Sequence, residues 1–426
     1  MMSMTGLSDQ QAQIVLCDEP NIIVDAAAGS GKTRTLVEKV RYVLECGANP
    51  STIVVITFTN PAADELYARL SDEPNYKKIF IGTIHSYANK LLKKTGKTYD
   101  IYSEVFENQF MTALISQYAK YCTIEDYNNY AKYMRMVANG KLSKSELSNL
   151  FSSPTVYKEI LYLLGEEQNF RYPVTVKTLC KQNNVITFDE LIVLATEHYN
   201  ETGVHPEYLF VDELQDIGYD EYNFLLSLNA PHNFFIGDDY QSIFGFKGGD
   251  VNIFLGLMKN PEWKTFYLTE NYRTASSILL FANTVIKKCS SIIDKQVVAK
   301  RKELGTLQFQ SSKLLEKYIS DNVHSGEDWL LMTRTNKEMN YVESIVKKLG
   351  IDYYCFKTSN VSKKKSEEIK SKKCVRVMTV HAAKGSEADN VLLYGKFPIK
   401  STTDEDEYKV FYVGITRAKD RCVICV

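Results

Sequence analysis

The sequence predicts an α/β fold with two parallel sheets, and three observations lead to this prediction. The apolar run NIIV at residues 21–24 is followed by the glycine-rich stretch DAAAGSGKTRT and the helix-like pattern LVEKVRYVL. Two further apolar runs, at residues 209–211 and 234–236, are followed by paired acidic residues, the first directly and the second after one glycine. From about residue 276 onward, strand-like apolar runs alternate with helix-like runs, which is typical of parallel sheets covered by helices.

Size, composition and charge are those of an ordinary globular chain. With 426 residues we expect two or three domains, and a hydrophobic content of 44% is sufficient for sizeable cores. Proteins that coat nucleic acid are often strongly basic, so a net charge of −1 gives no support for that function. This net charge is compatible with a local basic channel. Nine cysteines, no signal peptide and no membrane-length apolar run lead us to expect a cytoplasmic protein without membrane contact.

The glycine-rich stretch has the strand–turn–helix context of a phosphate-binding loop. Gly29 and Gly31 let the backbone bend so that successive N–H groups can face phosphate oxygens. In such a loop Lys32 reaches the outer phosphates of a nucleotide and the Thr33 hydroxyl ligates magnesium. The pattern usually begins with glycine, whereas this chain has Ala26, and a turn that binds nothing is the alternative.

The second group of candidate residues follows the apolar run in YLFVDELQD. Asp212 and Glu213 stand at the carboxyl end of the predicted strand, where ligands bind in open α/β sheets. We expect Asp212 to hold magnesium through water and Glu213 to orient and deprotonate an attacking water. An acidic loop without catalytic function is the alternative.

A third strand leads into the stretch NFFIGDDYQSIFGFKGG. The amide of Gln241 could sense a terminal phosphate or the attacking water. Phe244, Phe246 and Lys247 then set aromatic rings beside a cation, a combination that suits single-stranded nucleic acid. Each base stacked on a ring contributes roughly 1–3 kcal/mol. The alternative is that both phenylalanines belong to the hydrophobic core.

In this order along the chain, these stretches resemble the motifs of the UvrD/Rep family of superfamily 1 DNA helicases. Nine collinear segments carry the resemblance: LSDQQ (7–11, the Q motif), AAAGSGKTR (26–34, I), ITFTNPAADEL (56–66, Ia), IGTIHSYANKLL (81–92, Ib), VDELQD (211–216, II), IGDDYQSIFGFKG (236–248, III), LTENYRT (268–274, IV), VRVMTVHAAKGSEADNVLL (375–393, V) and EYKVFYVGITRAKD (407–420, VI). They cover nearly the whole chain.

The resemblance implies two RecA-like P-loop motor domains, with ATP and Mg²⁺ bound between them. It implies that Gln11 reads the adenine, Tyr272 stacks on it, and Arg273 and Arg417 reach the γ-phosphate from the second half of the chain. Guanidinium groups in that role are worth up to about 10³–10⁵ in rate. For a single arginine, a surface ion pair is the alternative. The expected nucleotide-binding residues are Gln11, Ala28, Gly29, Ser30, Gly31, Lys32, Thr33, Arg34, Tyr272, Gly385 and Glu387, and the expected catalytic residues are Lys32, Glu213, Gln241, Arg273 and Arg417.

The resemblance also implies a set of DNA contacts. Uncharged threonine and asparagine side chains position a strand through phosphate and sugar without reading its sequence. For the two histidines of this set, satisfied core residues are the alternative. Departures from the family pattern are Pro61, Phe246, Lys247 and Ser386, and none of them removes a catalytic group. The expected DNA-binding residues are Phe58, Thr59, Asn60, Thr83, His85, Phe244, Phe246, Lys247 and His381.

From the motif positions we expect a first motor domain at residues 1–90 and 187–265, a helical 1B-like insertion at 91–186, and a second motor domain at 266–426. The large 2B insertion of bigger relatives is absent, and the lysine-rich stretch at 358–373 takes its position as a solvated loop or a DNA-phosphate patch. Because the chain stops soon after motif VI, we expect no nuclease domain or partner-binding tail.

These observations lead to the expectation of an ATP-dependent DNA helicase that moves 3′ to 5′ on single-stranded DNA and unwinds duplex. The expected partners are single-stranded DNA and its junctions with duplex, and the expected form is a monomer. The alternatives are a translocase that displaces proteins without efficient unwinding, a nucleotide-switched loading factor, and an RNA substrate. The compact size and the abundance of Lys, Asn and Tyr are compatible with a phage-encoded protein in a bacterial cytoplasm.

Overall fold

The computed structural model describes residues 6–101, 112, 115–117, 119–127, 129–130, 148–151, 153–164, 184–355, 374–398 and 404–426. The chain divides into two compact units. The first unit comprises Met1–Ile84, His205–Tyr222 and Asn229–Val426, and the second comprises His85–Val204 and Asn223–Leu228. The first unit contains both large sheets, and all the nucleotide-site residues predicted above belong to it.

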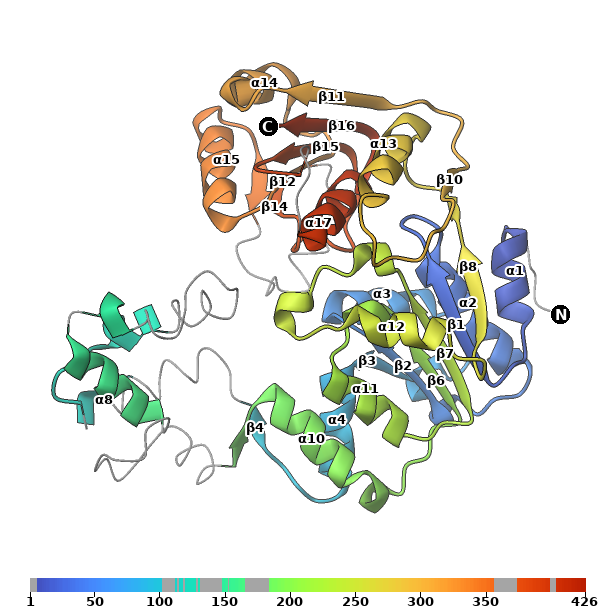
Figure 1. The fold of residues 1–426 in the computed structure, drawn as a ribbon. Helices are drawn as coiled ribbons and strands as arrows, with labels where there is room; N and C mark the ends of the chain where they lie inside the picture. Colours follow the sequence, from blue (N-terminus) through green and yellow to red (C-terminus); the bar gives the residue numbers. More distant parts are fainter. Residues whose placement is uncertain are drawn as a thin grey trace. The chain divides into compact units, whose positions relative to one another are not determined.

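The first sheet is six-stranded and parallel, with the order β3-β2-β6-β7-β1-β8 (Figure 1). Its central strands are rich in Ile, Val and Phe and are almost fully buried, as expected for a sheet covered on both faces. Its strands are β1 (Asn21–Ala26), β2 (Ile53–Thr57), β3 (Phe80–Thr83), β6 (Tyr208–Val211), β7 (His232–Gly237) and β8 (Lys264–Leu268).

Helices pack against this sheet through apolar stripes. In α2 (Lys32–Glu45) the stripe includes Leu36, Val40 and Val43, which join the core formed with β1, β2 and β7. The remaining helices of this part of the chain are α1 (Asp9–Leu16), α3 (Asn60–Arg69), α11 (Tyr219–Ser227) and α12 (Val251–Met258). Short 3₁₀ turns η5 (Leu214–Asp216), η6 (Asp239–Gln241) and η7 (Gly245–Lys247) follow the strands that carry the acidic residues.

The second sheet is also six-stranded and parallel, with the order β11-β16-β15-β12-β14-β13. Helices α13 and α17 belong to the core on one face, and α14 and α15 belong to the core on the other. Its strands are β11 (Thr306–Gln310), β12 (Trp329–Thr333), β13 (Tyr353–Cys355), β14 (Val375–Thr379), β15 (Ala388–Tyr394) and β16 (Ala418–Cys425). Its helices are α13 (Ser276–Ile286), α14 (Leu315–Asn322), α15 (Asn336–Lys348) and α17 (Glu405–Ile415).

Two short strand pairs complete the described part of the fold. Between the large sheets, β9 (Glu270–Asn271) pairs in parallel with β10 (Val298–Ala299). In the second unit, β4 (Asp100–Ile101) pairs with β5 (Val185–Ile186). Helices α4 (Ile84–Lys94), α8 (Pro154–Leu164) and α10 (Phe188–Glu197) accompany this second pair in the sequence, and α8 has its own small cluster around Ile160.

These sheets confirm the predicted α/β class with two RecA-like domains. The boundaries at residues 90, 187 and 266 stay predictions. Most of the expected helical insertion at 91–186, and the lysine-rich stretch at 358–373, lie outside the described residues. Among the described residues, no helix combines the length and the apolar character needed to cross a membrane.

Candidate active site

The glycine-rich loop joins β1 to α2 at the carboxyl edge of the first sheet. Gly29 and Gly31 have φ values of +68° and +86°, in the left-handed region that favours glycine. A Cβ atom at Gly29 would come within 2.8 Å of the Arg273 Cβ and of the Asn271 amide nitrogen. The loop therefore needs glycine for its backbone conformation and for the close approach of the segment that follows β8.

Lys32 opens α2, and its ammonium group faces the carboxyl edge. Its Nζ lies 3.1 Å from the Glu213 Oε1, and no well-aligned hydrogen bond to it exists among the described residues. Burial favours loss of the proton, but the carboxylates of Glu213, Asp238 and Asp212 outweigh that effect and raise the Lys32 pKa. A buried, charged donor with one loose partner can donate hydrogen bonds to an anionic oxygen.

The two acidic residues after β6 differ in their electrostatic environment. Burial, reinforced by the neighbouring Glu213 charge, raises the pKa of Asp212 to about 7. Burial also opposes ionisation of Glu213, but the nearby Lys32 and Lys384 hold the Glu213 pKa well below its usual value. Glu213 has φ +56°, a conformation that non-glycine residues adopt rarely and that is common at functional sites.

Arg417, the residue directly before β16, approaches this edge. Its side chain is 2% exposed, and its Nη2 donates to the Gln241 Oε1 at 2.7 Å. Its Nε and Nη1 donate to the carbonyl oxygens of Val413 and Ser386 at 3.1 Å and 3.3 Å. Burial, together with repulsion from Arg273, lowers the Arg417 pKa to about 9, so the guanidinium stays charged at neutral pH.

Arg273 is held beside the loop by a carboxylate. Its Nε donates to the Glu387 Oε2 at 2.7 Å, and the other Glu387 oxygen lies 2.9 Å from the Lys419 Nζ. Burial works against the Glu387 charge, but Arg273 and Lys419 outweigh it and lower the Glu387 pKa to about 2. Arg273 is therefore oriented by Glu387, a residue that the family resemblance assigned to the nucleotide.

The expected adenine residues also lie beside the phosphate loop. Ser8 and Gln11 form a reciprocal capping box at the start of α1, and the Gln11 Nε2 donates to the Ser30 carbonyl oxygen at 2.9 Å. The Tyr272 N–H donates to the Gly29 carbonyl oxygen at 2.9 Å, while its ring is 43% exposed. Both predicted adenine contacts thus touch the backbone of the phosphate loop.

The other predicted nucleotide residues surround the same loop. Thr33 lies in the first turn of α2 and is half-buried, whereas Arg34 is exposed beside Gly6. The Ala28 carbonyl accepts a hydrogen bond from the Asn271 side chain at 2.6 Å. Gly385 is exposed with φ +85° in the turn that carries motif V.

Sequence reasoning missed Lys384, which lies between His381 and Gly385 in the same turn. Its Nζ contacts the Asp216 carboxylate, donates to the Gln241 carbonyl oxygen at 2.7 Å, and lies 3.6 Å from the Glu213 Oε2. Membership of motif V was the signal that could have identified Lys384. Lys295, described below, was also missed, and it stands in no motif.

A cluster of four rings lies near this edge and comprises Phe58, Phe244, Phe246 and His381. Phe58 and Phe244 stack with centroids 5.2 Å apart, and Phe246 meets His381 edge-on at 5.3 Å. Phe244 is 8% exposed and belongs to the core, whereas Phe246 is 59% exposed. One of the two phenylalanines is therefore buried and the other is available to solvent, and their contacts with DNA stay predictions.

The remaining predicted DNA contacts are more dispersed. Thr59 caps α3 through its side chain, and Asn60 beside it is exposed. Thr83 ends β3 and is half-buried. In the second unit, His85 packs edge-on against Phe188, and burial lowers its pKa. For Lys247 the structure describes the backbone only.

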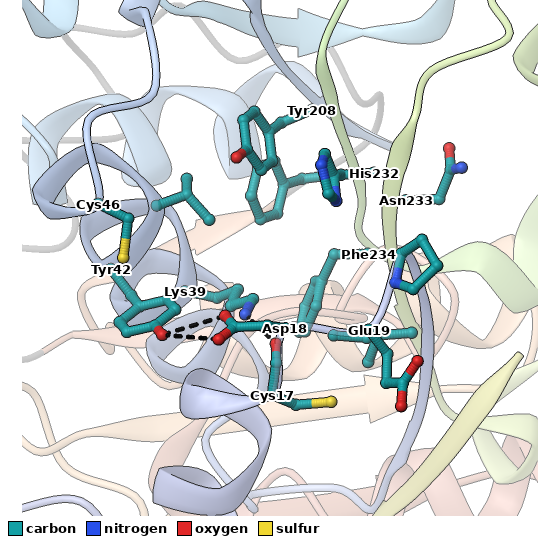
Figure 2. Close-up of a pocket in the computed structure, with 14 residues that line it drawn as sticks. Cys17, Asp18, Glu19, Lys39, Tyr42, Cys46, Tyr208, His232, Asn233 and Phe234 are labelled. Atoms are coloured by element: carbon teal, nitrogen blue, oxygen red, sulfur yellow. Dashed lines mark hydrogen bonds between the residues drawn. The ribbon is translucent and has the colours of Figure 1, made fainter.

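A separate pocket of about 210 Å³ lies at the opposite, amino edge of the first sheet (Figure 2). Phe210, Phe234 and Tyr208 line it, and the Tyr42 hydroxyl donates to Asp18 at its rim. The Lys39 Nζ donates to the carbonyl oxygens of Val15 and Cys17 at the end of α1. No residue predicted for the nucleotide or the DNA lines this pocket.

Comparison with known proteins gives two family matches, which are separated by residues 263–355. The model of the UvrD/REP helicase N-terminal domain matches residues 7–262, and that of the UvrD-like helicase C-terminal domain matches residues 356–426.

Several relatives have similar sequences over most of this chain. A probable DNA helicase of Mycoplasma pneumoniae is 28% identical across 98% of this chain and 82% of its own length. An ATP-dependent DNA helicase Rep of Buchnera aphidicola is 27% identical across 84% of this chain and 57% of its own length. An ATP-dependent DNA helicase PcrA of Leuconostoc citreum is 25% identical across 82% of this chain and 49% of its own length. The chain thus spans about half the length of the Rep and PcrA relatives.

Proposed function

This chain belongs to the UvrD/Rep helicase family, and from that premise we propose that it is an ATP-dependent DNA helicase that moves 3′ to 5′ on single-stranded DNA and unwinds duplex. The observation that carries the proposal is the convergence of charged groups from distant parts of the chain. Lys32, Glu213 and Gln241 belong to the first sheet's carboxyl edge, and Arg417 hydrogen-bonds to Gln241 there.

The residues present fit a magnesium–nucleotide complex. The Lys32 ammonium is buried and has no well-aligned hydrogen bond among the described residues. The Asp212 pKa is raised by burial and by the neighbouring Glu213 charge, which outweigh the effect of Lys32 and Lys384, so a further cation at Asp212 would be favourable. We expect the Thr33 hydroxyl and the Asp212 carboxylate to hold Mg²⁺, which would neutralise charge on the phosphates. Gln11 and Tyr272 would contact the adenine.

Nucleotide binding would also change the electrostatic environment of the Glu213 carboxylate. In this structure Lys32 pairs with Glu213 and helps to keep its pKa low. When Lys32 turns to the phosphates, Glu213 loses part of that stabilisation and becomes a stronger acceptor for the proton of the attacking water. Arg273 and Arg417 would stabilise the charge on the transferred phosphoryl group.

Hydrolysis would drive movement because Arg417 and Arg273 lose their γ-phosphate partner. A ligand shifts a conformational equilibrium only through its different affinities for the two states, and these arginine contacts provide that difference. A DNA strand would stack on the exposed Phe246 and contact the neighbouring hydroxyl and amide groups. We propose that the protein acts as a monomer at junctions of single strand and duplex.

The test compares the ATPase rate with and without single-stranded DNA, followed by unwinding of 3′-tailed and 5′-tailed duplexes. Lys32→Ala and Arg417→Ala should stay folded and lose the DNA-stimulated rate, whereas Arg69→Ala, which alters an exposed ion pair, should behave as wild type. Unwinding of the 3′-tailed duplex supports the proposal. Wild-type hydrolysis in Lys32→Ala would reject the site, and displacement of bound protein without unwinding would support the translocase alternative.

A further inference from the structure

A buried lysine outside every motif holds three carboxylates together beneath the phosphate loop. Lys295 lies in the segment between α13 and β10, and its Nζ is 2.8 Å from Oδ1 of Asp238 and 2.8 Å from Oδ1 of Asp239. It also contacts Oδ1 of Asp25. All four side chains are 0–1% exposed.

The enclosure of this ammonium is complete. The Tyr240 ring covers it, with its centroid 4.1 Å from Nζ. The Tyr240 hydroxyl donates to the Ile293 carbonyl oxygen at 2.9 Å and accepts from the Lys295 backbone N–H at 3.2 Å. The segment that carries Lys295 is thus fixed against the first sheet by its side chain and by its backbone.

The charges in this cluster do not balance. Three carboxylates surround one ammonium, and burial together with the repulsion of the two other aspartates raises the Asp25 pKa to about 7. One oxygen of Asp25 has no hydrogen-bond partner among the described residues. Buried ionic groups of this kind contribute little net stability compared with well-packed apolar residues. A function in arranging neighbouring groups accounts better for the cluster than stability does.

The cluster connects directly to the proposed catalytic groups. Asp238 accepts from Lys295 through Oδ1 and from the Gln241 Nε2 through Oδ2, the latter at 2.6 Å. An ionised carboxylate only accepts hydrogen bonds, so Gln241 must turn its NH₂ group toward Asp238. Its carbonyl oxygen then faces Arg417, which donates to it at 2.7 Å. Asp25, the penultimate residue of β1, lies just before the phosphate loop.

We propose that Lys295 is a positioning residue for ATP hydrolysis, which holds Asp238 so that the Gln241 amide presents its carbonyl oxygen to Arg417 and to the attacking water. This inference rests on the proposed ATPase function. Lys295 would not itself contact the nucleotide. It holds Asp238, which orients Gln241, and it holds Asp25, which lies just before the phosphate loop.

The test must separate positioning from folding, because Lys295→Met leaves three carboxylates buried without a cation. The decisive variant is therefore the triple change Lys295→Met, Asp25→Asn and Asp239→Asn. It removes two of the three negative charges along with the ammonium and leaves Asp238 in place. The matched control is Lys300→Met, an exposed lysine directly after β10 that pairs with Glu270.

The measurements are the thermal unfolding temperature, and kcat and KM for ATP with saturating single-stranded DNA. We expect Lys295→Met to lower the unfolding temperature and the triple variant to recover most of it. In the triple variant, kcat should stay about 100-fold below wild type because Gln241 is misplaced, while KM changes little. Lys300→Met should match wild type in both measurements.

A triple variant that recovers both the unfolding temperature and kcat would show that Lys295 only maintains the fold, and it would overturn the inference while leaving the proposed function intact. Equal kcat in wild type and Lys295→Met would also overturn it. A wild-type chain that hydrolyses no ATP with DNA present would reject the proposed function and this inference together.

Discussion

Arg417 and Gln241 are 176 residues apart in the sequence, and the guanidinium of one donates to the amide oxygen of the other at 2.7 Å in a buried environment. Gln241 is held at its other end by Asp238, and Arg417 by the carbonyl oxygens of Val413 and Ser386. Contacts within the protein therefore fix both side chains. This arrangement reduces the reorganisation needed when charge develops on a phosphoryl group.

Arg417→Lys should lower kcat by about 10³ and change the KM for ATP little. A lysine ammonium cannot reproduce the fork by which Arg417 reaches Gln241, Val413 and Ser386 together. The measurement is steady-state ATPase with saturating single-stranded DNA. Arg69→Lys, at an exposed ion pair with Glu65, is the control. Retention of more than a tenth of the wild-type kcat in Arg417→Lys would argue against a guanidinium-specific role.

Phe246 and Phe244 should respond differently to replacement by alanine. Phe246 is 59% exposed, so Phe246→Ala should weaken single-strand binding by about 1–3 kcal/mol and leave the unfolding temperature unchanged. Phe244 is 8% exposed within the core, so Phe244→Ala should reduce the free energy of unfolding by about 3–5 kcal/mol.

The measurements for this pair are DNA binding by fluorescence anisotropy at fixed salt and urea unfolding. The same loss of stability in both variants would mean that Phe246 also packs in the core. An unchanged dissociation constant for Phe246→Ala would remove it from the proposed DNA contacts.

The strand–loop–helix units were predictable because their pattern is local. The apolar runs before Asp212 and Asp238 became β6 and β7, and the pattern after the phosphate loop became α2. β11 had no comparable signal, because it lies at the sheet edge and most of its residues are exposed.

The ion pairs around the site were not predictable from local sequence patterns. Lys295 and Asp25 are 270 residues apart, and no motif or spacing connects them. The family resemblance identified Glu387 as a nucleotide contact but gave no sign that it pairs with Arg273 and Lys419. Such pairs form because distant segments of the chain fold back to the carboxyl edge of the first sheet. A local sequence pattern carries no information about which distant residues meet there.

Magnesium binding should depend on pH through Asp212. Its pKa is raised from 3.8 to about 7, so this group contributes stability that is fully present below pH 3.8 and is lost as the pH rises toward 7. Mg²⁺ bound to the ionised carboxylate would compensate for that loss. We therefore expect Mg²⁺ with a non-hydrolysable ATP analogue to raise the unfolding temperature more at pH 8 than at pH 6.

Below pH 7, the Mg²⁺ concentration for half-maximal ATPase should increase by about tenfold per pH unit, after correction for the titration of ATP itself, because a proton and the metal compete for one carboxylate. Asp72→Asn, which alters an exposed carboxylate, should keep this dependence, and Asp212→Asn should lose hydrolysis. A magnesium requirement that stays constant between pH 6 and pH 8 would contradict a metal-binding role for Asp212.

Lys384 should couple DNA binding to ATP hydrolysis, because it contacts both the proposed catalytic groups and the aromatic cluster proposed to bind DNA. Its Nζ contacts Asp216 and donates to the Gln241 carbonyl oxygen, and it lies 5.3 Å from the centroid of the Phe244 ring in the aromatic cluster. A strand that stacks on this cluster can therefore shift Lys384 relative to Gln241 and Glu213. We expect Lys384→Met to reduce the stimulation of ATPase by DNA more than it reduces the rate without DNA.

Loss of Lys384 also leaves the buried Asp216 without its cation, which would destabilise the fold by about 3–5 kcal/mol. The double variant Lys384→Met, Asp216→Asn removes that charge and separates stability from coupling. If the double variant recovers the unfolding temperature but its ATPase responds weakly to DNA, Lys384 transmits the effect of the strand. Full recovery of the response would instead assign Lys384 to the support of the fold, with coupling carried by other contacts at the carboxyl edge.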